Sequence, residues 1–144
     1  MRGAGLCEGT GKTPKTVREA IDQGRQCENL LMPTVDTKGN IYVVGSTGSR
    51  DLPVTAGAFQ RAFGGGKEDG LLAALGPDGS KSLYCTYLGG SGDDIIRSIA
   101  FGPKGEVYLV GSTSSEAFPV TPGALQRDYR GKGDAFLVKL VPDT

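Results

Sequence analysis

The sequence predicts an all-β protein assembled from copies of one antiparallel unit, because it contains an internal repeat, short apolar runs and Gly-rich turns. Residues 38–47, KGNIYVVGST, return 66 residues later as residues 104–113, KGEVYLVGST. The similarity continues at the same offset from residues 52–61 to residues 118–127. Self-similarity at a fixed spacing is typical of folds that stack one structural unit on the next.

Four apolar runs of strand length make up a unit. The runs at residues 41–44 and 107–110 show little polar alternation, which predicts strands covered on both faces. The runs at residues 83–88 and 136–140 alternate more, which predicts strands nearer an edge of the sheet. A further run at residues 95–101 supplies the strand that opens the second copy.

Turn residues separate these runs. Segments 36–40, 76–79 and 102–105 supply Gly, Pro or Asp at the positions that tight turns require, so consecutive strands are expected to be antiparallel neighbours. In the long loop after the second strand, Thr121 precedes a Pro and predicts one helical turn, as does Thr55 in the first copy.

A four-stranded antiparallel unit that stacks on copies of itself is the blade of a β-propeller, and a solenoid is the main alternative. We therefore predict about two blades: residues 31–98 form repeat 1, and residues 99–144 form an incomplete repeat 2 that lacks the last strand. Closed propellers have about four to eight blades, so we expect other blades, from the same protein or a partner chain, to complete the ring. Residues 1–30 form an N-terminal extension, in which residues 13–24 predict a short helix or cap.

Composition narrows the possible partners. The net charge is zero, which argues against a nucleic-acid partner, and no stretch is long and apolar enough to span a membrane. The first 20 residues lack the apolar core of a signal peptide. The three cysteines include no Cys-x-x-Cys pair, and this spacing argues against a zinc site. Cys7 and Cys27 are candidates for a disulfide, and Cys85 is expected to be a small buried residue.

The chain contains four further segments of note: TYLGGSGDD at residues 86–94, GEVYLVGST at 105–113, FPVTPGALQ at 118–126 and DAFLVKL at 134–140. In this order and spacing they strongly resemble the bacterial β-propeller repeat family called SBBP. The resemblance covers residues from about 33 to 144 and implies a propeller, usually within multi-repeat bacterial proteins that are exported or displayed on the cell surface. It implies no reaction and no cofactor.

Two segments resemble ligand-binding loops only superficially. Residues 9–13, GTGKT, lack the Gly that a P-loop needs at the position of Leu6, so a flexible Gly-rich N-terminus is the preferred interpretation. In the loop at residues 89–94, Asp93 and Asp94 could bind a hard cation such as calcium, but Gly and Asp also favour tight connections, and the spacing is not that of a calcium loop.

Other carboxylates and tyrosines also have structural interpretations. Asp69 and Asp134 begin equivalent strands and are expected to anchor turns, with a general acid–base pair as the alternative. The chain has no His, and no nucleophile is paired with a base at motif spacing, so we predict no catalytic, cofactor-binding or metal-binding residues.

Recognition is expected at the loops rather than on the strands. The four strand tyrosines are expected to pack between blades rather than bind sugars or peptides. They are Tyr42, Tyr84, Tyr87 and Tyr108. The loop tips at residues 48–51 and 114–117, with Arg61 and Arg127, are better candidates for contact with a protein or carbohydrate ligand.

The sequence thus favours a non-catalytic repeat module that acts as a binding or scaffold segment of an exported or cell-surface protein. The alternative is part of an exported propeller hydrolase or lyase acting on polysaccharide, which clustering of Asp93, Asp94 and Asp134 in one cleft would favour. In a third interpretation, two-blade protomers exchange an edge strand to close a ring.

Overall fold

The computed structural model describes residues 33–143, which form seven strands and no helix. The strands are β1 (Thr34–Val35), β2 (Ile41–Thr47), β3 (Asp69–Leu75), β4 (Ser82–Leu88), β5 (Asp94–Phe101), β6 (Val107–Thr113) and β7 (Asp134–Leu140). The expected N-terminal helix, the Cys7–Cys27 pair and the Gly-rich segment at residues 9–13 lie outside the described residues.

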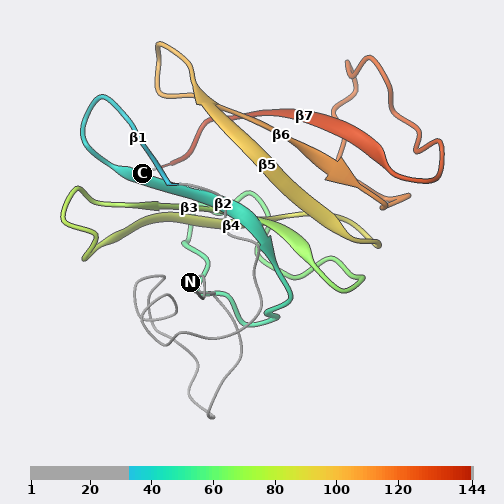
Figure 1. Ribbon diagram of the computed structural model, residues 1–144, viewed down its shortest axis with the longest axis horizontal. Coiled ribbons are helices and arrows are strands. Elements are labelled where there is room, and N and C mark those ends of the chain that lie inside the picture. Colours follow the sequence, from blue (N-terminus) through green and yellow to red (C-terminus); the bar gives the residue numbers. More distant parts are fainter. Residues whose placement is uncertain (1–32, 144) are drawn as a thin grey trace.

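The strands form two antiparallel sheets in which sequence neighbours are also spatial neighbours. One sheet has the order β1-β2-β3-β4 and the other the order β5-β6-β7. The turns that join consecutive strands within each sheet contain glycines with positive φ. Among them are Gly39 at 84° and Gly105 at 85°, which occupy equivalent positions of the two copies. The all-β prediction with consecutive antiparallel strands is confirmed, and the two sheets do not close into a ring (Figure 1).

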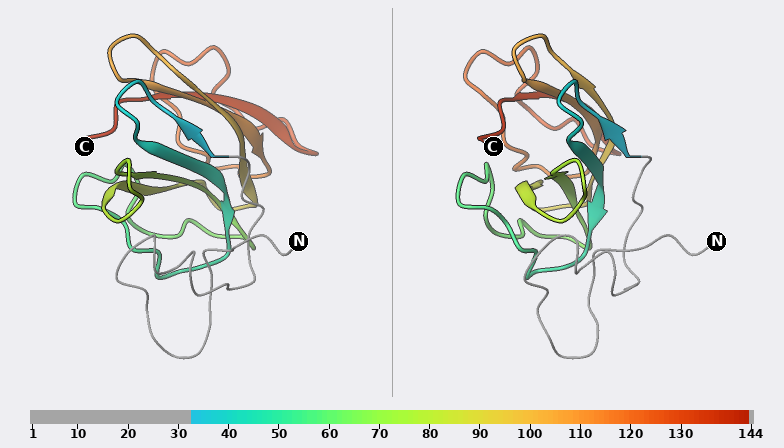
Figure 2. Two further views of the ribbon diagram at one scale, coloured as in Figure 1. Left: turned by 60° about the vertical axis from the view of Figure 1, so that its left-hand side comes forward. Right: turned by 90° about the vertical axis from the view of Figure 1, so that its left-hand side faces the viewer.

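The two sheets stack face to face (Figures 1 and 2). Between them lies a hydrophobic cluster to which the first sheet contributes Tyr42, Val44 and Leu72, and the second contributes Ile96 and Leu109. The two sheets contribute opposite faces to this interface. The second sheet contributes Phe136, for example, whereas the equivalent residue of the first sheet, Leu71, lies on the face directed away from the interface. One sheet therefore covers one face of its neighbour and leaves its own opposite face for another contact.

The other face of the first sheet is covered by the long loop after β2. Leu52 from this loop packs with Leu71, Cys85 and Tyr87 in a second cluster. Cys85 is fully buried, and burial raises the pKa of its thiol to about 12, so it is the small buried residue that the sequence predicted. Because both faces of β3 are covered, all seven of its residues are buried.

Three predictions from the sequence differ from the structure. The helical turns expected at Thr55 and Thr121 are β-turns, closed by single hydrogen bonds from Ala58 N (3.1 Å) and Ala124 N (3.0 Å). Each turn is a single one that does not continue into a helix. Strand β6 was expected to be covered on both faces, but Val110 is 42 % exposed, since no other described strand packs on that side.

Gly70 permits a close approach between the two sheets. A Cβ atom at this position would lie 2.6 Å from Leu88 O and 2.9 Å from Cγ1 of Ile96 in the second sheet. The equivalent residue of the second sheet is Ala135, which is exposed. The repeat therefore tolerates a Cβ at this position where no other sheet packs against it.

We expect Gly70→Ala to destabilise the protein by about 1–3 kcal/mol, because the added methyl group would displace both Leu88 of β4 and Ile96 of the second sheet. The measurement is the urea midpoint of unfolding followed by circular dichroism. Gly123→Ala is the matched control, since no atom lies within 4 Å of its Cβ position, and it should leave the midpoint nearly unchanged. Equal midpoints for both variants would contradict this account of the sheet interface.

Candidate functional site

The connector between the sheets, residues 89–94, carries two aspartates that both accept hydrogen bonds. Asp93 Oδ1 accepts from Lys67 N of the first sheet's long loop at 2.6 Å. Asp94 Oδ2 accepts from Ser115 Oγ of the second sheet's loop at 2.7 Å. The two carboxylates therefore tie the connector to a loop on each side.

Asp94 lies beside Asp69, the first residue of β3, with Gly89 between them. A Cβ atom at Gly89 would be 2.7 Å from Asp69 Oδ1 and 2.7 Å from Asp94 Oδ2. Both aspartates are 0 % exposed. One oxygen of each, Oδ1, has no hydrogen-bond partner within residues 33–143. Two buried carboxylates thus face each other without full hydrogen bonding.

The environment of Asp69 favours its neutral form. Burial, together with the nearby charge of Asp94, raises the pKa of Asp69 to about 6, although hydrogen bonds oppose this. Those bonds reach Oδ2 from Gly64 N at 2.6 Å and from Gln60 Nε2 at 3.2 Å. Asp69 accordingly keeps its proton to a higher pH in the folded chain than in the unfolded chain.

Asp134 repeats this arrangement at the start of β7. Its Oδ2 accepts from Arg130 N at 2.9 Å and from Gln126 Nε2 at 3.1 Å. Asp69 and Asp134 therefore anchor turns in the same way, as their equivalent positions predicted. Thr113 lies between Asp94 and Asp134 in the sheet register, and Asp94 is buried whereas Asp134 is half-buried. The structure therefore does not gather Asp93, Asp94 and Asp134 into one open cleft.

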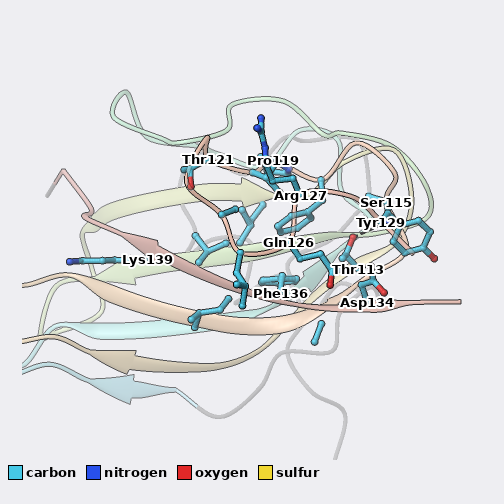
Figure 3. A pocket seen from close by; sticks show the side chains of 18 of the residues that line it. Thr113, Ser115, Pro119, Thr121, Gln126, Arg127, Tyr129, Asp134, Phe136 and Lys139 are labelled. Atoms are coloured by element: carbon cyan, nitrogen blue, oxygen red, sulfur yellow. Dashed lines mark hydrogen bonds between the residues drawn. The ribbon is translucent and has the colours of Figure 1, made fainter. Parts of the chain in front are cut away.

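A groove of about 680 Å³ runs along β7 beneath the loop that precedes it. Pro119, Thr121 and Arg127 lie on the loop side of this groove, and Phe136 of β7 lies on the other (Figure 3). Its floor contains a stacked pair of rings, Phe118 and Phe136, with centroids 4.6 Å apart. The groove is accessible and largely apolar, which distinguishes it from the buried carboxylate pair.

The residues expected to make recognition contacts divide between the two sheets. Arg127 and Ser115 line the groove, whereas Arg61 donates a hydrogen bond to Ala56 O at 2.9 Å. Tyr108 also lines the groove, near Lys139, whose Nζ is 5.8 Å from the centroid of its ring. Tyr42 and Tyr84 are buried between the two sheets, as expected. Tyr87 is buried instead beneath the long loop of its own sheet.

Sequence analysis missed the role of Gln60. Its amide holds Asp69 through Nε2, and its Oε1 accepts from Gly89 N at 3.0 Å, so one side chain links loop, strand and connector. Gln126 occupies the same position of the second copy and holds Asp134. The recurrence of Gln at this position was the available signal.

Comparison with known families agrees with the repeat seen in the structure. The model of the SBBP β-propeller repeat matches residues 34–53 and 83–119, which confirms the resemblance of this chain to the SBBP family. These segments contain β1, β2, β4, β5 and β6, together with the connector between the sheets. No curated protein matches the chain.

Two further properties concern the described residues alone. Within residues 33–143, no group of three or more His, Cys, Asp or Glu side chains is placed to hold a metal ion. Over the same residues, no helix has the length and apolar character needed to cross a membrane.

The raised pKa of Asp69 predicts that its contribution to stability falls with rising pH. This contribution is fully present below the ordinary carboxyl value of 3.8 and is lost as the pH rises through about 6. We therefore expect the melting temperature of the wild-type chain, relative to Asp69→Asn, to fall as the pH rises from about 4 to about 7. Differential scanning calorimetry across this range measures the difference.

Asp134→Asn is the matched control for this experiment, because Asp134 makes the same two kinds of hydrogen bond at a half-buried position. Its difference from wild type should vary less over the same range. A wild-type profile parallel to that of Asp69→Asn would show that Asp69 does not hold its proton in the way proposed.

Proposed function

We propose that this chain is a non-catalytic β-propeller repeat module, a pair of neighbouring blades that binds further blades and serves as a scaffold segment. The first sheet is a complete four-stranded blade and the second a three-stranded one. The SBBP match supports this assignment, because propeller blades stack side by side. The resemblance also supports placement in an exported or cell-surface bacterial protein.

One comparison within the molecule carries the proposal. Val44 and Leu72 on the first sheet are 1 % and 0 % exposed because the second sheet covers them. Their equivalents on the second sheet, Val110 and Leu137, pair across β6 and β7 and are 42 % and 70 % exposed. The face that buries a neighbouring blade in the first copy is therefore open in the second.

The occupant we assign to this face is another blade. Val110 and Leu137 are apolar, and the half-buried Tyr108 extends the same face along the strand. Apolar surface of this kind gains roughly 25 cal/mol for each Å² that a partner removes from water. A second copy of the chain is the simplest source of such a partner.

A catalytic role receives less support from the same geometry. The hydrolase or lyase alternative needs carboxylates that reach a substrate, but Asp69 and Asp94 are both fully buried. Asp93 is engaged by Lys67 N. Asp134, which like Asp93 is half-buried, accepts from Arg130 N. A glycosidase requires a pair of carboxylates that act on one bond, whereas Asp93 and Asp134 each hold a loop.

We expect the purified chain to associate with rising concentration, as measured by light scattering on a sizing column. Leu137→Asp combined with Val110→Asp should shift the mass to that of the 14.9 kDa monomer, because two charges would be buried in the contact. Leu125→Asp is the matched control, since Leu125 is fully exposed in the loop and lies off this face. A wild-type chain that stays monomeric, or that associates equally in both variants, would contradict the proposal.

A further inference from the structure

The way the first sheet holds β4 provides a template for the groove of the second sheet. Strand β4 pairs with β3 on one side and is bound by the long loop on the other. Thr55 N donates to Cys85 O at 3.1 Å, and Tyr87 N donates to Gln60 O at 3.2 Å. The loop therefore contacts the outer edge of β4 as an additional strand would.

Side chains complete this clasp. The hydroxyl of Tyr87 donates to Ser49 O at 2.7 Å and accepts from Leu52 N at 2.9 Å. The hydroxyl of Tyr84 accepts from Phe59 N at 3.0 Å. Each of these tyrosines binds main-chain groups of the loop, so an aliphatic residue cannot replace them.

The strand's own backbone and one threonine add further contacts. Gln60 N donates to Thr86 Oγ1 at 2.9 Å, and Cys85 N donates to Thr55 Oγ1 at 3.2 Å. Gln60 Oε1 then accepts from Gly89 N, just after the strand ends. The loop and β3 together form a clasp around β4, and the hydrogen bonds of the loop extend from the middle of β4 to Gly89, the residue that follows it.

The second sheet has the same clasp with no strand between its two sides. The residues equivalent to Ser49, Leu52, Thr55, Phe59 and Gln60 are Ser115, Phe118, Thr121, Leu125 and Gln126, and all five line the groove. Ser, Thr and Gln are retained at the three positions whose side chains or carbonyls bind in the first copy. Among the described strands, β7 pairs with β6 alone.

The loop at residues 130–133 also differs from its equivalent in the first copy, because it has open space where the first loop contacts the connector. In the first copy, Cβ atoms at Gly64 and Gly65 would lie 2.6 Å from Gly90 O and 2.9 Å from Ser91 O of the connector. In the second copy, nothing lies within 4 Å of the Cβ position of Gly131. A connector that follows the missing strand therefore has room here too.

We propose that the groove between β7 and its preceding loop binds an extended strand of another polypeptide segment that has the β4 pattern, Tyr-x-Thr-Tyr-Leu-Gly or a close variant. The inference rests on the proposed function, because it treats the two sheets as copies of one unit. The β4 of a second folded copy is already paired with β3, so the donor is a segment whose strand is not yet in a sheet.

Transfer of the β3–β4 register fixes how this strand would lie. The residue equivalent to Tyr87 would be opposite Phe136, with its hydroxyl near Ser115 O and Phe118 N. The residue equivalent to Tyr84 would be opposite Lys139, whose Nζ already lies near one aromatic ring. In the first sheet Ala73 is paired with Cys85, and Val138 occupies the position of Ala73 in the second sheet. Because Val is larger than Ala, the groove should favour a small residue at the peptide position equivalent to Cys85.

The test uses the full chain and a fluorescein-labelled peptide of residues 81–92 in which Cys85→Ser prevents oxidation. We expect saturable binding with one peptide per chain by fluorescence anisotropy, and no binding of a scrambled peptide. Tyr87→Phe in the peptide should weaken binding about tenfold, because the hydroxyl makes two hydrogen bonds in the template. Absence of saturable binding would overturn the inference.

Matched protein variants locate the site. Thr121→Val removes the hydroxyl that should accept from the peptide backbone and should weaken binding severalfold. Thr37→Val, at an exposed threonine of the β1–β2 turn, should not change it. Equal binding to both variants would overturn the assignment to the groove.

Hydrogen exchange separates this inference from the proposed function. Bound peptide should slow exchange in β7 and leave β3 unchanged, whereas protection of β3 would mean that the peptide displaces β4 and would overturn the inference. Val110→Asp by itself acts on the exposed face, at a residue that does not line the groove, so loss of association together with retained peptide binding would support both statements independently. Association without peptide binding would contradict only the present one.

Discussion

The arrangement of the two sheets depends on the hydrogen bonds that hold the short connector between them. Five residues lie between β4 and β5, and the first two of them, Gly89 and Gly90, are buried. Buried backbone donors and acceptors need partners, since each unpaired one costs about 1–3 kcal/mol. Gln60 binds the connector from the first sheet and Ser115 binds it from the second. Because each loop also covers its own sheet, the connector fixes both where the next sheet begins and how it is oriented.

The need to satisfy these backbone groups explains why aspartates occupy positions where the sequence also allows an acid–base pair. A carboxylate can accept several backbone amides at once, which makes it suited to fix a tight loop. Asp69 accepts from Gly64 N, Asp94 accepts from Gly90 N, and the close approach at Gly89 brings the two carboxylates together. The raised pKa of Asp69 follows from this architecture. A perturbed carboxylate is a common sign of an active site, but burial and structural ion pairing produce the same effect.

The sequence predicted the strands well because three of the four strands of the first unit recur in the second. A run such as residues 107–111 could be a strand or a buried helix segment by itself, but its match to residues 41–45 within the same order of turns excludes a chance pattern. Burial was harder to predict. Val110 and Val44 are the same residue at the same strand position, yet only one is covered, because coverage depends on a neighbouring sheet and not on the strand itself. The Asp69–Asp94 contact was unpredictable for a similar reason: it joins a strand of one copy to the connector that leads into the next.

The same reasoning explains why the groove was not visible in the sequence. The sequence predicts a helical turn at Thr121, whereas the equivalent loop of the first copy binds β4 along its outer edge. A loop that contacts a strand edge leaves little local pattern, because most of the contacts are made by main-chain groups that every residue has. Only the internal comparison reveals them: two loops of nearly the same sequence adopt the same turn, and one encloses a strand where the other encloses a groove. In a repeat protein, the contact made in one copy is therefore the most direct description of what the next copy is built to bind.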